Sequence, residues 1–224
     1  HTTPKGRWEF GIFQPLTVGV TDRITFSTHP VVDILMPNLT LKVAWESICG
    51  WDFATEHTLT SPTPLLMVIS REGTGGILPN DTVVPWIVTL SNTVYATRQY
   101  AKGHLFTAKI ASHIAARFGP STLPTIDLPV VFPRTSAWHD VAAFNFGVDL
   151  AGKLAGDFRY EVDVDLWLMP RAETFYAFEH SAVIAYRPLS WFGVEIGYKI
   201  ILGQYPYGFD WHILPLIDLQ FAVD

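Results

Sequence analysis

Apolar and polar residues alternate along most of this chain, most clearly from Phe158 to Leu168. The even-numbered residues of this stretch are apolar or aromatic, and the odd-numbered ones include the charged residues Arg159, Glu161, Asp163 and Asp165. A period of two predicts a β-strand with one apolar and one charged face. In a soluble sandwich the charged face would meet water. In a membrane barrel the apolar face would meet lipid, and the charges would line the lumen.

The same alternation predicts strands along the rest of the chain, and no stretch of useful length has the helical period. Single-chain bacterial barrels have an even number of strands. Our count is odd, so we expect a missed strand near 51–64 or a miscount at the N-terminus. The predicted strands are 8–20, 24–34, 39–46, a short irregular one at 65–70, 84–98, 105–118, 141–150, 158–168, 176–186, 192–200 and 211–223.

Composition favours the membrane interpretation. Hydrophobic residues make up 49% of the chain and charged residues 16%, against roughly 25% charged in an average soluble domain. The mean hydropathy is +0.23, yet the longest aliphatic runs, such as 65–69, are far shorter than the ~20 residues of a spanning helix. We therefore predict an all-β fold, a closed antiparallel transmembrane β-barrel of about 10–12 strands, forming one domain over residues 1–224.

Charge and cysteine content limit the binding partners and the covalent cross-links that we expect. The net charge of −6 argues against a nucleic-acid partner. Cys49 is the single cysteine, so no disulfide can form within the chain. The polar start, His-Thr-Thr-Pro-Lys, leads us to expect a mature chain from which a signal peptide has been removed.

Connection lengths predict an orientation. Short connections at 21–23, 98–104, 151–157 and 187–191 alternate with longer ones at 71–81, 119–139 and 203–209. Outer-membrane barrels have short periplasmic turns and longer extracellular loops, so we expect the C-terminus on the periplasmic side.

Aromatic residues are then expected to form two girdles at headgroup depth. The outer girdle would hold Trp8, Trp86, Phe118, Tyr176 and Trp211, and the inner one Phe106, Tyr160, Tyr186 and Phe192.

Short motifs add a family resemblance. The turn Val18-Gly19-Val20-Thr21-Asp22-Arg23-Ile24, together with Tyr186-Arg187-Pro188 and Val194-Glu195-Ile196-Gly197-Tyr198, resembles Gram-negative outer-membrane β-barrel proteins of the porin-like class. This resemblance implies architecture and no specific activity. One departure is the C-terminal end: such barrels usually end in an aromatic residue, whereas here Phe221 is followed by Ala222-Val223-Asp224.

The alternation along the strands predicts that the polar side chains line the lumen, and these side chains carry both signs of charge. Two alternatives are open for these side chains: they pair across a narrow interior and fill it, or they leave a thin water path whose charge pattern sets selectivity. The predicted lumen residues are Lys42, Glu46, Lys109, His113, Arg117, Arg159, Glu161, Asp163, Asp165, Glu179, Glu195 and Lys199.

One constellation suggests catalysis. A carboxylate two residues before a histidine, as in Asp210 and His212, can orient the imidazole as a general base, and Asp163 and Asp165 could hold the attacking water. The grouping is similar to the acid and base groups of omptin-type outer-membrane proteases. The plain alternative is an ion pair at the rim. No histidines have metal-ligand spacing, so we expect no metal and no cofactor.

The favoured interpretation is a porin-like or structural protein of the bacterial outer membrane, which we do not expect to be an enzyme. Its expected partners are membrane lipid and small solutes. The alternatives are an outer-membrane barrel hydrolase and a soluble ligand-binding β-barrel with its apolar faces inside. Lipid-facing small residues on one strand, Ala108, Ser112 and Ala116, would allow contact between barrels in a homo-oligomer. His180 also has lipid-facing parity, which is costly unless it lies near the interface or faces another subunit.

Overall fold

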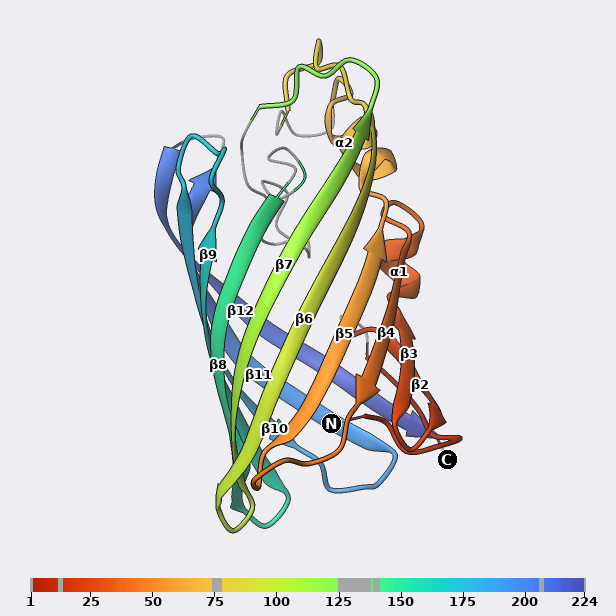
Figure 1. Ribbon diagram of the computed structural model, residues 1–224, viewed down its shortest axis with the longest axis vertical. Helices are drawn as coiled ribbons and strands as arrows, with labels where there is room; N and C mark the ends of the chain where they lie inside the picture. Colours follow the sequence, from red (N-terminus) through yellow and green to blue (C-terminus); the bar gives the residue numbers. More distant parts are fainter. Residues whose placement is uncertain are drawn as a thin grey trace.

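Twelve strands close into one antiparallel barrel in which each strand pairs with its neighbours in chain order and β1 pairs with β12 (Figure 1). The computed structural model describes residues 2–11, 14–73, 78–124, 138, 142–205 and 208–223. No helix within these ranges is long and apolar enough to cross a membrane. The elements are β1 (Trp8–Gly11), β2 (Leu16–Thr21), β3 (Ile24–Thr28), α1 (Pro30–Asp33), β4 (Asn38–Ala44), β5 (Asp52–Thr60), α2 (Thr63–Ile69), β6 (Trp86–Ala101), β7 (His104–Phe118), β8 (Ala142–Ala155), β9 (Phe158–Leu168), β10 (Tyr176–Tyr186), β11 (Phe192–Tyr205) and β12 (Gly208–Val223).

The all-β barrel is confirmed, and so is the expectation of a missed strand near 51–64, which is β5. Three N-terminal assignments were wrong. Segment 8–20 forms two strands, β1 and β2, and segment 24–34 is a strand only as far as Thr28, where β3 ends before helix α1. The predicted strand at 65–70 is instead helix α2. Prolines suit the first turn of a helix, and Pro64 occupies that turn. The run that follows is apolar on consecutive positions, so it lacks the alternation of a strand wall.

The connections divide into two ends. The turn end holds the connections 22–23, 45–51, 102–103, 156–157 and 187–191 together with both termini, and lies low in Figure 1. The loop end holds the connections 29–37, 61–85, 119–141, 169–175 and 206–207. The last of these was expected to be a long loop at 203–209. The prediction was wrong because β11 extends to Tyr205 and β12 begins at Gly208.

The two faces of the wall differ sharply in character. On β7 the side chains of Ile110, Ile114 and Phe118 are 58%, 53% and 62% exposed, whereas Ala111 and Ala115, of the opposite parity, are buried. Buried polar residues share the inner parity on other strands, for example Thr89, Asn145, Glu179 and Asp218. Apolar outside and polar inside is the arrangement of a transmembrane barrel. It is the reverse of the soluble ligand-binding alternative.

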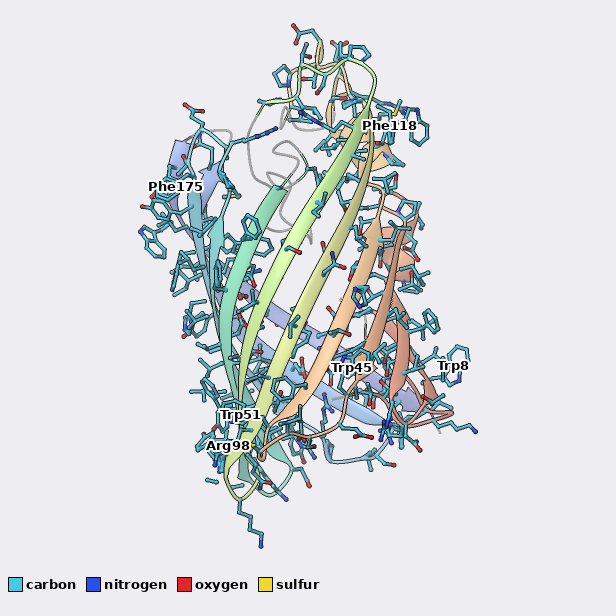
Figure 2. The ribbon with its side chains drawn as sticks, in the orientation of Figure 1. Trp8, Trp45, Trp51, Arg98, Phe118 and Phe175 are labelled. Atoms are coloured by element: carbon cyan, nitrogen blue, oxygen red, sulfur yellow. The ribbon has the colours of Figure 1, made fainter. Side chains whose placement is uncertain are left out.

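Aromatic side chains lie at both ends of the wall. Trp86 pairs with Phe118 at the loop end, and Tyr186 pairs with Phe158 at the turn end. Trp8 was assigned to the outer girdle but lies at the turn end, where it pairs with Val223 (Figure 2). The error follows from reading β1 and β2 as one long strand, which reversed the direction of the first crossing.

The barrel wall is uneven in height. Strands β1 to β4 have only 4 to 7 residues, fewer than the about 9–11 of a full membrane crossing. Helix α1 stands above them, and Val31 of the helix and Ile34, directly after it, are exposed. On β12, the stretch 208–219 pairs only with β11 among the described strands. Pro215 lies in this stretch, in keeping with the confinement of proline to strand edges.

An apolar plug fills the barrel interior near the loop end. Leu65 and Leu66 of α2 pack with residues from the connections, and the cluster contacts five wall residues: Ile87, Ala115, Ala143, Trp167 and Ala177. The Thr63 hydroxyl fixes the start of α2 to the wall by accepting a hydrogen bond from the Ile87 N–H at 2.8 Å. We define the plug as Met36, Leu65, Leu66, Leu78, Trp138 and Met169, all of which are buried.

A lysine placed on the outer face should be costly in proportion to its depth. We expect Ile110→Lys, in the middle of β7, to lower the free energy of unfolding by about 2–4 kcal/mol, and Ala116→Lys, nearer the loop end, by about 0–1 kcal/mol. Urea unfolding in lipid vesicles measures both. Equal costs at the two positions would contradict the assignment of this face to lipid.

Candidate functional site

Lys109 lies at the centre of the densest ionic cluster on the inner face. Its Nζ is 3.0 Å from Asp149 Oδ1 and 3.0 Å from Asp165 Oδ2. It also donates a hydrogen bond to Asp163 Oδ2. The four side chains come from β7, β8 and β9 and are 12–18% exposed. The strand register explains why these side chains lie together, because Asp149 is directly opposite Asp163 on the neighbouring strand.

A glycine makes room for this cluster. Gly147 lies between Lys109 and Asp165 in the pairing of β7, β8 and β9. A Cβ at this position would collide with both side chains. The missing side chain therefore lets the lysine reach across β8 to the carboxylates of β9.

Further inner-face charges pair across neighbouring strands. Lys42 Nζ lies 3.5 Å from Glu56 Oε2, and the Tyr95 hydroxyl donates to Glu56 Oε1 at 3.2 Å. On the other side of the Lys109 cluster, Lys199 Nζ lies 2.6 Å from Glu179 Oε2. Paired charges thus occur on every strand from β4 to β11 except β6, which contributes Tyr95. Buried charges are tolerated when they are paired in this way.

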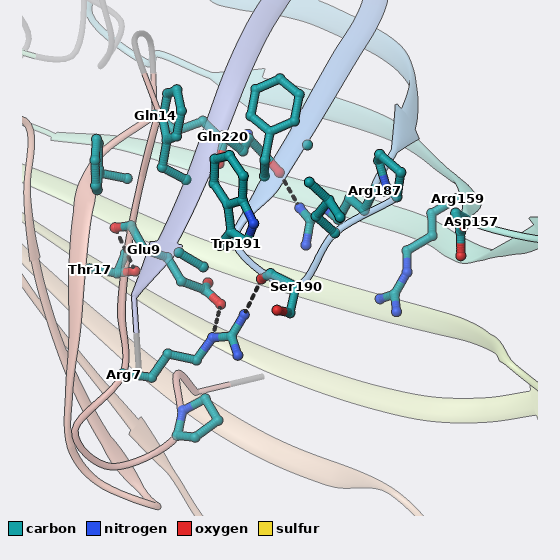
Figure 3. A pocket seen from close by; sticks show the side chains of 18 of the residues that line it. Arg7, Glu9, Gln14, Thr17, Asp157, Arg159, Arg187, Ser190, Trp191 and Gln220 are labelled. Atoms are coloured by element: carbon teal, nitrogen blue, oxygen red, sulfur yellow. Dashed lines mark hydrogen bonds and ion pairs between the residues drawn. The ribbon is translucent and has the colours of Figure 1, made fainter.

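Cavities of about 600 Å³ and about 410 Å³ lie at the turn end. Figure 3 shows the larger one, where Arg7 lies 2.9 Å from Glu9 and Arg187 donates a hydrogen bond to Gln220. Arg187 and Arg159 line both cavities. Within the described ranges, Arg159 has no ion-pair or hydrogen-bond partner, and it lies directly opposite Lys153. This end of the interior therefore has room for water and is rich in arginine.

The predicted lumen residues fall into three groups. Lys42, Lys109, Asp163, Asp165, Glu179 and Lys199 belong to the paired charges above. His113 is buried beside the plug, Arg117 is exposed near the loop end of β7, and Arg159, Glu161 and Glu195 line the cavities. Glu46 was misplaced: it lies in the exposed β4–β5 connection, 3.6 Å from Arg23. The cause is that β4 ends at Ala44, two residues earlier than predicted.

The catalytic candidates do not assemble. Asp163 and Asp165 contact Lys109 on the β7 side. Asp210 and His212 lie on β12, with β10 and β11 between them and β9. The Asp210 carboxylate accepts a hydrogen bond from the Trp211 N–H at 2.7 Å. The structure therefore offers no grouped acid, base and water site from these four residues.

Register also brings together residues that sequence reasoning missed. Ser91 Oγ lies 2.7 Å from His113 Nδ1, and the His113 ring stacks on Trp167 with centroids 4.8 Å apart. Asp149 could have been found by extending the parity of its predicted strand. Glu56, the partner of Lys42, was not predicted because it lies on β5, a strand that the sequence analysis did not assign. Within the described ranges, no three His, Cys, Asp or Glu side chains are grouped so that they could hold a metal ion.

Comparison with known proteins assigns this chain to no family. No protein-family model matches the sequence, and no curated protein is significantly similar to it. A bacterial polysaccharide outer membrane secretin aligns over 99% of this chain and 77% of its own, with 8% identity and a TM-score of 0.47. OccK11 (OpdR) of Pseudomonas aeruginosa aligns over 97% and 63%, with 11% identity and a TM-score of 0.42. The NanC porin aligns over 96% and 97%, with 12% identity and a TM-score of 0.41.

The closed antiparallel barrel of twelve strands confirms the predicted architecture by itself, and nothing is argued from these structures, whose TM-scores are below 0.5. Identities of this size carry no substrate or activity from those proteins to this chain.

Removing the central lysine should strongly destabilise the barrel. Lys109→Met leaves three mostly buried carboxyl groups facing one another, and breaking a buried ion pair from one side costs about 3–5 kcal/mol. We expect a loss of this size in the free energy of unfolding in lipid vesicles. Arg23→Met, which removes an exposed pair, is the matched control and should cost about 0–1 kcal/mol. Equal losses would show that the cluster contributes no more than a surface ion pair.

Proposed function

We propose that this protein is a porin-like barrel of the bacterial outer membrane that gives small polar solutes a narrow and usually closed path. The observation that carries the proposal is the inner face, where ion-paired side chains line the wall and the interior widens into a cavity of about 600 Å³ at the turn end. A polar, hydrated interior with an apolar exterior suits solute passage. In this proposal the chain reaches the outer membrane after a signal peptide has been removed.

The paired charges would form the constriction of this path. One ammonium group, on Lys109, stands among three carboxyl groups, so the constriction offers oxygens to a passing solute or cation. Rings of carboxylates favour cations in narrow pores. The mixed-charge lumen is therefore proposed as the filter of the channel.

The apolar plug would hold the path closed at the loop end. Its residues are buried against the inner wall, and a hydrophobic constriction resists water and ions because it dewets. Opening would require the plug to leave its seat on wall residues such as Trp167 and Ile87. Hydrolysis is not part of the proposal, since the four catalytic candidates lie apart.

Planar-bilayer conductance tests the proposal. We expect the wild-type barrel to show low conductance. The double variant Leu66→Asn with Trp167→Ala should raise single-channel conductance severalfold, because it makes the plug polar and removes the ring on which His113 stacks. Ile110→Ala, on the outer face, is the matched control and should behave as the wild type.

Heat-modifiable gel mobility must show that each variant forms a barrel. Porin-sized conductance in the wild type would contradict the closed plug. An inserted plug variant that still does not conduct would contradict a continuous solute path.

A further inference from the structure

Three polar residues lie side by side on the outer face, where apolar residues are expected. In the strand pairing, His57 of β5 is directly opposite Asn92 of β6, and Asn92 is directly opposite Ser112 of β7. Their neighbours of the same parity include Leu59, Leu90 and Ile114, all exposed apolar residues. We call His57, Asn92 and Ser112 the polar row.

The polar row keeps hydrogen-bonding groups unused. His57 Nδ1 lies 2.8 Å from Asn92 Oδ1. An amide oxygen can only accept, so this ring nitrogen is the donor and Nε2 is left as an acceptor. The Asn92 amide nitrogen and the Ser112 hydroxyl have no side-chain partner among the described residues. The row therefore presents both donors and acceptors to whatever faces it.

The depth of the row excludes lipid as the natural partner. Ser112 lies between Ile110 and Ile114 in the middle of β7, and Asn92 lies between Leu90 and Val94 on β6. Hydrocarbon at this depth offers no hydrogen-bond groups, so an unmatched polar side chain there is costly. Lipid ester and headgroup oxygens stay at the interface. A protein surface with matching groups at the same depth would relieve the cost.

We propose that the outer face of β5, β6 and β7 binds a second copy of this chain through the polar row. Two copies inserted in the same orientation bring identical rows to the same depth. A two-fold axis along the membrane normal then sets donors of one row against acceptors of the other. Small residues permit close approach of the two walls: Ala96 and Ala108 lie directly opposite each other, one outer-face pair beyond Val94 and Ile110, which are next to the row. The inference does not depend on whether the barrel conducts.

Cysteine cross-linking in lipid vesicles or native outer membranes tests this interface. In a Cys49→Ser background, Ser112→Cys should give a covalent dimer with a short bis-maleimide cross-linker, because a two-fold axis through the middle of the row places the two Ser112 positions on either side of it. Ile213→Cys, on the exposed outer face of β12, is the matched control and should stay monomeric. Equal dimer yields at the two positions, no dimer at Ser112→Cys, or a conjugate with a different protein there would each overturn the proposal.

A second variant separates the interface from folding. We expect His57→Leu combined with Asn92→Leu to weaken dimerisation about tenfold in detergent, because two membrane-buried hydrogen bonds are lost. Sedimentation equilibrium measures the dissociation constant, and heat-modifiable mobility reports the intact barrel. His180→Leu, an outer-face histidine on β10 bonded to Tyr198, serves as control and should leave the constant unchanged. An unaltered constant in the double variant would overturn the role of the row.

Discussion

A closed ladder of backbone hydrogen bonds is the constraint on which the rest of this structure depends. Hydrocarbon offers no partners to backbone N–H and C=O groups, so a sheet that crosses a membrane must leave no free edge. Here closure rests on four residue pairs between β1 and β12, from Trp8 with Val223 to Gly11 with Gln220. Once the ladder closes, one parity of every strand faces lipid and the other faces the interior. Closure of the barrel therefore determines which side chains must be apolar and which can be polar.

Side chains fill the interior in two different ways. Toward the turn end, charges pair across neighbouring strands, as Lys109 does, or face a cavity, as Arg187 does. Toward the loop end, the wall carries alanines and Trp167 on its inner parity, and the plug covers them. Polar pairing and apolar filling thus share one lumen. On the outer face, the polar side chains of His57, Asn92 and Ser112 lie together on adjacent strands.

The fold was predictable wherever both faces of a strand differed clearly. Alternation in β7, β9 and β10 identified the strands and their inner charges. It failed at β5, whose outer face holds Thr55 and His57 among its apolar residues, and at β1, whose four residues merge with β2 in the sequence. Parity also shows which way a side chain points but not its neighbour. Lys109 meets three aspartates because of register and Gly147, and both depend on the turns and pairing of the whole barrel.

The inversion of the two faces is tested most directly by spin labels along β9. In a Cys49→Ser background, each residue from Phe158 to Leu168 is replaced in turn by a labelled cysteine, and collision with molecular oxygen dissolved in the bilayer is measured. The account predicts high collision rates at even-numbered positions and low rates at odd-numbered ones, with a period of two. High rates at Glu161 and Asp163, with shielding at Tyr160 and Val162, would contradict it.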